Sequence, residues 1–287
     1  RQVAERVSAQ PDELVWTSGA TESNNLALKG IADGADKPGH LLTSALEHKA
    51  VLDTVAELER QGWAVTRLMP DQAGLIQPDA VRQALRDDTR LVSLMAVNNE
   101  LGTVTDYAAI GEIVRAHGAI LHVDAAQAVG KIALDLREQA VDLMSFSAHK
   151  VYGPKGIGAL YVGPRARPLM HAQMHGGGHE GGLRSGTLAT HQIAGMGSAF
   201  ALAGEPAEAE QQRIHQLSER LLNGLLALPG VALNGCPQQR IANTLNLRIA
   251  TPGFNSAALA SELALSTTSA CNSASNAPSH VLLALGH

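Results

Sequence analysis

Lys150 follows an apolar run and precedes a glycine-rich stretch, in the segment "SFSAHKVYGPKG". Burial of a lysine is costly because its charge must be desolvated or neutralised. Met144 and Phe146 indicate a short buried strand that ends near this lysine. Lys150 could end the strand in solvent, or its amine could be placed for covalent chemistry such as a Schiff base. The residues that follow the other apolar runs help to separate these interpretations.

Three more polar side chains follow apolar runs of strand length. Asp124 closes "AILHVD", Gln127 lies three residues later, and His48 follows "HLLTSALE". A carboxylate at the end of a buried strand needs a partner to stay ionised. Asp124 could cap the next helix or pair with a protonated heterocyclic nitrogen. An isolated histidine is more often a core or surface residue than a catalyst, so His48 alone decides nothing.

The segment "SGATE" places small residues directly before a predicted helix. Such residues let backbone N–H groups approach an anion, such as a phosphate, at the helix N-terminus. The alternative is an ordinary N-cap made by Ser18 or Thr21. This stretch resembles neither a Walker lysine loop nor a G-x-G-x-x-G fingerprint. It is therefore compatible with a phosphate site or with a capped helix.

Strand-length apolar runs alternate with longer helical patterns through the first part of the chain. Strands are predicted at residues 13–19, 40–46, 90–97, 119–127, 142–149 and 157–163, and helices at 22–34, 48–62, 78–88 and 106–118. This alternation predicts an α/β fold with a mostly parallel sheet that helices cover on both faces. Ligands of such sheets bind at the carboxyl ends of the strands. The anion cradle, Asp124, His48 and Lys150 would meet at that edge, and pyridoxal phosphate needs such a set.

A second unit is predicted after a long helical stretch from about residue 188 to residue 228. A strand at 243–250, a helix at 256–264 and a loop of small polar residues follow it. We therefore predict a large cofactor-binding domain at 1–205 and a small α+β domain at 206–287. The chain begins in what reads as the middle of a helix and ends inside an apolar helical pattern. We accordingly expect both domains to be incomplete and the chain to be a fragment.

Composition argues against several classes of function. The 22 basic and 27 acidic residues give a net charge of −5 without a basic run, which argues against direct binding of nucleic acid. The longest apolar stretches are too short to span a membrane. Two cysteines suggest neither a secreted disulfide framework nor a zinc site, so a reducing, cytoplasmic compartment is expected. His171, His175 and His179 recur every four residues, but the three glycines at 176–178 disfavour a helix there, and we predict no metal site.

Seven segments of the chain are similar to the cysteine desulfurases and occur in the order of that family. They are "TSGATESNN", "EHKAVLDT", "VNNELGTV", "HVDAAQAVGK", "SFSAHKVYGPKGIGALYV", "GGGHEGGLRSGT" and "TTSACNSAS". The similarity is greatest to the iron–sulfur-cluster-assembly type and covers nearly the whole chain. It implies a homodimeric, fold type I enzyme that uses pyridoxal 5′-phosphate to convert L-cysteine to L-alanine and moves the sulfur to an enzyme cysteine as a persulfide. The implied partners are an iron–sulfur scaffold protein and sulfur-relay acceptors, including those of tRNA thiolation.

The resemblance also implies roles for individual residues. Lys150 would hold the cofactor as a Schiff base and move a proton, Asp124 would pair with the pyridinium nitrogen, and His48 would stack on the ring and shuttle protons. Thr187 would reach the phosphate of the neighbouring subunit. The other implied cofactor contacts are Asn99 and Gln127 at the ring or its phenolic oxygen, and Ala20, Thr21, Ser147 and His149 at the phosphate.

Cys271 lies in "LSTTSACNSASNAP", where small side chains and few apolar anchors predict a mobile loop. A lone cysteine is usually buried and inert. Here the polar loop and the flanking motif favour a catalytic nucleophile that accepts the substrate's sulfur. Cys271 could also serve as a transient iron–sulfur ligand. Cys236, in "LNGCPQQR", is interpreted as a turn residue.

The chain is expected to depart from the family pattern at both ends and at one internal position. An Asn-Ala-Thr-Thr-like segment before the first residue and a C-terminal arginine that holds the substrate carboxylate are not in the sequence, and Gly181 stands where an arginine is common. The role of Arg184 stays open. A selenocysteine lyase or an aminotransferase is the alternative enzyme, although a transaminase needs no thiol such as Cys271. A scaffold without catalytic activity is the alternative from another class.

Overall fold

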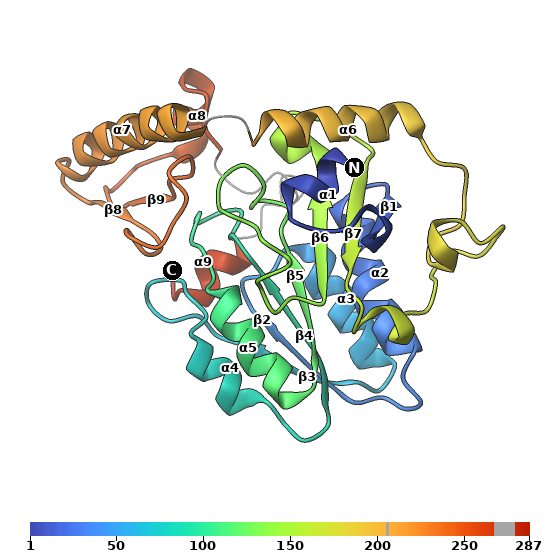
Figure 1. Ribbon diagram of the computed structural model, residues 1–287. Coiled ribbons are helices and arrows are strands. Elements are labelled where there is room, and N and C mark those ends of the chain that lie inside the picture. The colour runs from blue at the N-terminus through green and yellow to red at the C-terminus, as the bar shows by residue number, and fades with distance from the viewer. Residues whose placement is uncertain (205–206, 267–278) are drawn as a thin grey trace.

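The computed structural model describes residues 1–204, 207–266 and 279–287, and a seven-stranded sheet forms its centre (Figure 1). The strands lie in the order β1-β7-β6-β5-β4-β2-β3. The edge strand β3 was not predicted from the sequence, because it is only partly buried and therefore carries a weak apolar pattern. The strands are β1 (Leu14–Thr17), β2 (His40–Ser44), β3 (Ala64–Leu68), β4 (Thr89–Met95), β5 (Ile120–Asp124), β6 (Leu143–Ser147) and β7 (Gly158–Val162).

Most of the sheet is parallel, and β7 is the exception. Strands β6, β5, β4, β2 and β3 pair in parallel, whereas β7 is antiparallel to both β6 and β1. Only residues 148–157 separate β6 from β7, which is too short for a crossover helix, so the chain turns back. Because β1 and β6 are both antiparallel to β7, they point the same way. The carboxyl ends of β1, β2, β4, β5 and β6 therefore lie at one edge.

Helices cover both faces of the sheet (Figure 1). Helices α2 and α3 pack on one face through apolar residues such as Leu28 and Val55. Helices α1, α4, α5 and α6 contribute to the core on the other face, which includes Ile110 and Phe200. The predicted α/β fold class is confirmed. The helices are α1 (Gln2–Arg6), α2 (Ala20–Asp33), α3 (Lys49–Arg60), α4 (Pro78–Ala84), α5 (Tyr107–His117) and α6 (Thr190–Leu202), with the 3-10 helices η1 (Pro11–Glu13), η2 (Ala148–Val151), η3 (Arg167–Leu169) and η4 (Glu180–Gly182).

The C-terminal elements form a smaller group beside the large sheet (Figure 1). The helical pattern predicted at about 188–228 is divided between α6 and α7, and a short antiparallel pair, β8 and β9, follows. Helix α9 returns to the large sheet, where Val281 packs against Leu46 and Leu101. The division into domains at residue 205 stays a prediction. These elements are α7 (Ala207–Leu226), β8 (Val231–Leu233), β9 (Leu247–Ile249), α8 (Ser256–Glu262) and α9 (His280–Ala284).

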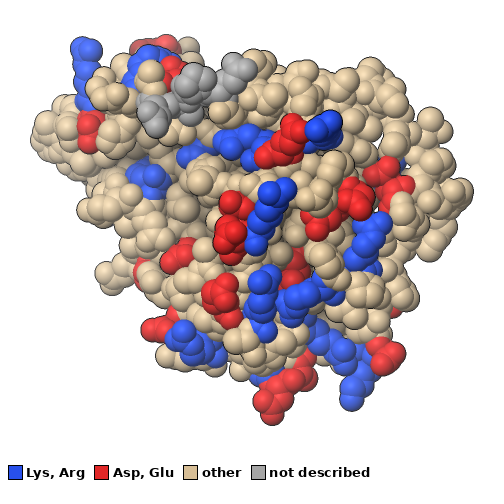
Figure 2. Space-filling model, in the orientation of Figure 1, with Lys and Arg blue, Asp and Glu red and all other residues tan. Residues whose placement is uncertain are grey.

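Acidic and basic side chains are interspersed on the face of the molecule shown in Figure 2. Such mixing accords with the small net charge of −5. Within the described ranges, the helices include none with the length and apolarity needed to cross a bilayer.

Candidate active site

A cavity of about 900 Å³ lies at the carboxyl-end edge of the sheet. The strand register places chemical groups side by side there, since Met95 of β4 is opposite Asp124 of β5, which is opposite Ser145 of β6. The last residues of β1 and β6, Thr17 and Ser147, both face Gly158 of β7. A cavity of this size is in the range of pockets that hold a cofactor and a small substrate.

This cavity brings together all the residues predicted for the site except Thr187 and Cys271. Thr187 is exposed and is not among the described residues that line the cavity. Cys271 lies outside the described residues. The predicted residues that line the cavity are Ala20, Thr21, His48, Asn99, Asp124, Gln127, Ser147, His149 and Lys150.

Asp124 lines the cavity and is only 5% exposed. Its Oδ2 accepts a hydrogen bond from Asn24 Nδ2 at 2.7 Å, and its Oδ1 accepts one from the backbone N–H of Ala126 at 3.0 Å. Burial raises the pKa of Asp124, while these donors and the nearby charges of His48 and Lys150 oppose the rise. A desolvated carboxylate that faces a cavity suits a ligand with a cationic ring nitrogen.

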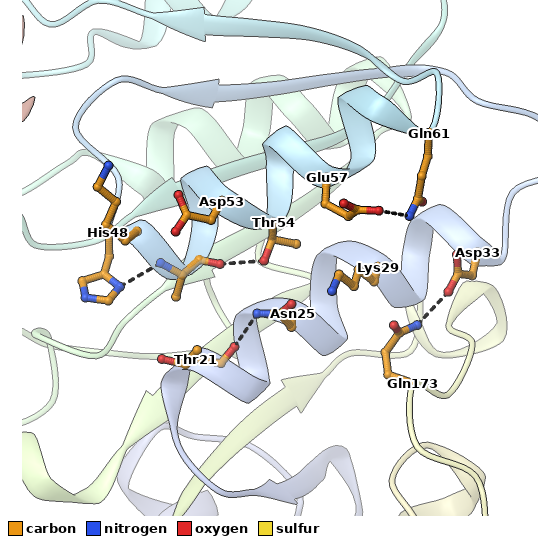
Figure 3. A pocket seen from close by; sticks show the side chains of 12 residues that line it. Thr21, Asn25, Lys29, Asp33, His48, Asp53, Thr54, Glu57, Gln61 and Gln173 are labelled. Atoms are coloured by element: carbon orange, nitrogen blue, oxygen red, sulfur yellow. Dashed lines mark hydrogen bonds between the residues drawn. The ribbon is translucent and has the colours of Figure 1, made fainter. Parts of the chain in front are cut away.

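His48 is held by the first turn of α3, of which it is the N-cap. Its Nδ1 accepts the backbone N–H of Ala50 at 3.1 Å, so the proton of the neutral ring lies on Nε2 (Figure 3). Burial lowers the pKa of His48, Lys150 adds to this effect, and Asp124 opposes it. His48 is therefore a neutral imidazole at pH 7, able to act as a base or to stack on an aromatic ring.

Lys150 lies in η2, directly after β6, and its side chain is exposed where it lines the cavity. The charge of Lys150 therefore does not have to be buried, because the buried strand β6 ends before this residue. The following turn needs glycine at Gly156, with φ +81°. At Gly158 an added Cβ would lie 2.6 Å from the Cα of Gly19, so β7 can approach the β1–α2 connection closely only without a side chain there.

Another part of the cavity wall is formed by the N-terminus of α2. The N-cap is Gly19, and no side chain caps the helix, so the alternative of a cap by Ser18 or Thr21 is wrong. Ser147 Oγ lies 2.8 Å from His149 Nδ1 beside this end. An uncapped helix N-terminus surrounded by hydroxyl and imidazole groups is a suitable place for a phosphate. The carboxylate, the amine and this helix end together fit pyridoxal 5′-phosphate.

The comparisons with known proteins agree with this geometry. The Aminotransferase class-V family matches residues 1–285. "Cysteine desulfurase IscS" of Acinetobacter baumannii (strain AYE) is 59% identical over 288 residues, which cover 99% of this chain and 71% of the relative. The protein of the same name from Azotobacter vinelandii is 58% identical, with 100% and 71% covered.

The chain belongs to the cysteine desulfurases, within the class-V aminotransferase family.

Two solved structures support the same assignment. "SspA in complex with cysteine" has a TM-score of 0.88 and 40% identity, over 100% of this chain and 80% of that one. DndA from Streptomyces lividans has a TM-score of 0.87 and 38% identity, over 100% and 82%. The predicted family, enzyme class and cofactor are confirmed, since enzymes of this family use pyridoxal 5′-phosphate.

Four residues in or beside the cavity were missed by the sequence analysis. Asn24 binds Asp124, and Glu22 lines the cavity beside Thr21. Lys131 Nζ donates to Gln127 Oε1 at 2.7 Å, and burial together with the charge of Lys150 lowers its pKa to about 8. Asn24 could have been found, because a polar residue at buried positions of an amphipathic helix needs a partner.

Glu47 is the fourth of these residues and is only 1% exposed. Its Oε1 accepts hydrogen bonds from Ser44 Oγ at 2.6 Å and from the backbone N–H of Met95 at 3.1 Å. Burial, together with the negative charge of Asp124, raises the pKa of Glu47 to about 8, against the effect of these donors. Its position directly before His48 gave no signal in the sequence, because its partners are distant in the chain: Met95 of β4 binds its side chain, and His280 of α9 lies 2.9 Å from its carbonyl oxygen.

The remaining sequence hypotheses concern residues away from the cavity. Cys236 lies between β8 and β9, where its Sγ accepts the N–H of Gln239 at 3.3 Å, in agreement with a turn residue. The glycines at 176–178 have φ values of +135°, +77° and +67°, so no helix aligns the three nearby histidines. Across the described residues, no cluster of three His, Cys, Asp or Glu side chains is placed to hold a metal ion.

A polar groove lies between α2 and α3 (Figure 3). Thr21 and His48 line both the groove and the cavity. Further along, Asn25 Nδ2 donates to the carbonyl of Thr21 at 3.0 Å, and Thr54 Oγ1 donates to the carbonyl of Ala50 at 2.8 Å. Thr21 and His48 therefore lie between the groove and the cavity.

Proposed function

We propose that this protein removes sulfur from L-cysteine, releases L-alanine, and carries the sulfur as a persulfide on Cys271. The observation that carries the proposal is the convergence of Asp124, Lys150 and the uncapped N-terminus of α2 on one cavity. An exposed amine beside a buried carboxylate is suited to a carbonyl cofactor with a basic ring nitrogen. The solved structure of SspA, which contains cysteine, is the relative that supports the substrate.

Pyridoxal 5′-phosphate, when bound, supplies an aldehyde for amines and a ring that accepts electrons from the substrate carbon. In this proposal, Asp124 pairs with the ring nitrogen, and Gln127 and Asn99 bind the ring substituents. The amides of Ala20 and Thr21, together with Ser147 and His149, would hold the phosphate. Each of these side chains lines the cavity, which supports the assignment.

Two groups of the chain move protons in the proposed reaction. Lys150 is exposed to the cavity and takes the proton from the substrate's α-carbon at Nζ. His48 is neutral because burial lowers its pKa, so it can accept a proton near pH 7. Asp124, the last residue of the buried strand β5, would hold the ring nitrogen.

In the proposed sulfur step, Cys271 is the acceptor. The bond between Cβ and sulfur of the substrate breaks, a sulfur–sulfur bond forms at Cys271 Sγ, and the carbon receives a proton. One L-cysteine and one thiol thus give one L-alanine and one persulfide, without another oxidant. Cys271 follows Ser266, which lines the cavity, by five residues, and five residues of chain span at most about 17 Å.

The later fate of the sulfur and the assembly of the enzyme are part of the same proposal. The sulfur would pass to an iron–sulfur scaffold protein and to acceptors for tRNA thiolation, in the cytoplasm. The enzyme would be a homodimer in which Thr187 binds the phosphate of the neighbouring subunit. The exposed position of Thr187 outside its own cavity is compatible with this arrangement.

A spectroscopic and chemical experiment tests the proposed function. The purified protein with pyridoxal 5′-phosphate should show a visible absorption band that L-cysteine perturbs, and Lys150→Ala should abolish the band. Cys271→Ser should keep the band but lose protein-bound persulfide and alanine formation, whereas Cys236→Ser should match the parent. Alanine formation at the parent rate by Cys271→Ser would contradict the role of that thiol, and absence of the band in the parent would contradict the cofactor site.

A further inference from the structure

Arg184 and Glu22 form an ion pair at the phosphate end of the cavity. Arg184 Nε lies 2.8 Å from Glu22 Oε1, and Nη2 lies 3.5 Å from Oε2. The two side chains are only 18% and 20% exposed, unlike most other ion pairs in the described part of the chain. A pair so shielded from water interacts more strongly than a surface pair, and loss of one partner leaves a poorly solvated charge.

Glu22 lies where a phosphate would bind. It belongs to the first turn of α2, lines the cavity together with Thr21, and is the acidic residue of that turn. Its Oε2 also accepts the backbone N–H of Ser18 at 2.7 Å. An unpaired carboxylate at this place would repel a phosphate dianion.

Several contacts fix the segment that carries Arg184. Arg184 forms a parallel bridge with Met174, and the N–H of Ser185 donates to the carbonyl of Met174 at 3.3 Å. In the same segment, Glu180 Oε2 accepts the backbone N–H of Trp16 in β1 at 2.9 Å. The segment that places the guanidinium beside Glu22 is thus hydrogen-bonded to the sheet.

The pKa of Glu22 agrees with a carboxylate whose negative charge is compensated. Burial would raise the pKa of Glu22, but hydrogen bonds from Arg184 and Ser18 and the positive charge of Arg184 bring it below its usual value. Glu22 is therefore a carboxylate at pH 7, and its charge must be offset if a phosphate is to bind next to it.

We propose that Arg184 is a positioning residue that neutralises Glu22, so that the N-terminus of α2 accepts the phosphate of the cofactor. The sequence left the role of Arg184 open. This inference rests on the proposed cofactor site, and it adds that phosphate affinity depends on the Arg184–Glu22 pair. Arg184 acts through Glu22 and needs no contact with the phosphate itself.

Pyridoxal and pyridoxal 5′-phosphate differ only in the phosphate, so the ratio of their affinities reports on this end of the cavity. Dissociation constants are measured by fluorescence on the cofactor-free protein. Arg184→Met should weaken binding of pyridoxal 5′-phosphate about tenfold and binding of pyridoxal less than about threefold. The control is Arg213→Met, which removes the exposed Arg213–Glu210 pair of α7 and should change neither constant.

A second substitution tests whether Arg184 compensates the charge of Glu22 or only supports the loop that carries it. Adding Glu22→Gln to Arg184→Met removes the repelling charge while an amide oxygen can still accept the N–H of Ser18, and it should restore most of the lost phosphate selectivity. Arg184→Lys should retain most of that selectivity because it keeps the positive charge. If Arg184→Met does not fold, Glu22→Gln alone should still strengthen binding of pyridoxal 5′-phosphate, about threefold.

The outcomes distinguish this inference from the proposed function. Equal weakening of both ligands by Arg184→Met, no rescue by the second substitution, or weaker binding in Glu22→Gln would each overturn the inference while the parent still binds the cofactor. A parent that binds neither ligand, or that binds both unchanged after Lys150→Ala, would overturn the proposed cofactor site and the inference with it.

Discussion

Two of the carboxylic side chains that line the cavity, Asp124 and Glu22, have opposite surroundings. Asp124 is held at the ring end by an amide and a backbone N–H, and burial raises its pKa. Glu22 is held at the phosphate end by the guanidinium of Arg184, and its pKa is lowered. The protein therefore neutralises Glu22 with its own arginine. It leaves Asp124 available to pair with a cationic group of the ligand.

The difference shows how one cavity can bind a ligand with charges of both signs. A cationic ring nitrogen is attracted only if the nearby carboxylate is not already paired with a protein cation. A phosphate is attracted only if the nearby carboxylate is paired. Asp124 and Glu22 meet these opposite requirements because Asp124 ends a central strand, whereas Glu22 lies at a helix end within reach of a surface loop.

The largest effect is expected from Asp124→Asn, which removes the charge at the ring end without changing the shape of the side chain. Alanine formation from L-cysteine should fall about 10³-fold, because electrostatic support of the ring nitrogen is lost. Steady-state kinetics would measure the fall, with the exposed Asp36→Asn as the control. An Asp124→Asn enzyme that retains a tenth of the parent rate would contradict the assignment.

A second prediction concerns Glu47, a buried carboxyl group whose pKa is raised in part by the charge of Asp124. Its pKa is about 8 in the folded protein and near 4.5 in the unfolded chain, so the folded state binds the extra proton between these values. Stability from this group is present below about pH 4.5 and is lost as pH rises toward 8. Glu47→Gln should remove that loss, worth up to about 4 kcal/mol in the free energy of unfolding.

Chemical denaturation of the parent and of Glu47→Gln at pH 5 and pH 8 measures the effect of that residue. The variant should gain stability relative to the parent only at the higher pH. The exposed Glu112→Gln is the matched control and should follow the parent at both values. An equal change at pH 5 and pH 8 would mean that Glu47 is not held protonated.

The smallest effect is expected from Lys131→Met. Lys131 Nζ fixes Gln127 Oε1, so the Nε2 group of Gln127 is left to donate into the cavity. Its loss should weaken binding of pyridoxal 5′-phosphate and of pyridoxal alike, each about threefold to tenfold, because the ring end serves both ligands. Binding constants of both ligands, with the exposed Lys37→Met as the control, provide the measurement. A selective loss of phosphate affinity would assign Lys131 to the other end.

Much of this architecture follows from local sequence signals. The alternation of apolar runs with helical patterns is enough to predict a parallel sheet, because strands buried on both faces must be continuously apolar. The ends of those strands then predict that Lys150, Asp124 and His48 share one edge, since parallel strands bring their carboxyl ends together. The motif around Lys150 carries the family resemblance because the turn after this lysine needs particular glycines.

Other features depend on contacts between residues that are far apart in the chain. Asn24 and Asp124 are 100 residues apart, and Arg184 and Glu22 are 162 apart, so no local pattern reveals either pair. The sequence also allowed a side-chain cap at the N-terminus of α2, whereas the structure has none. Residue types alone do not decide this, because a cap depends on the backbone geometry at the helix N-terminus. The sequence by itself determined which elements form and which chemical groups follow them. Only the tertiary structure decided which charges are buried and paired, because burial and pairing arise when distant segments exclude water together.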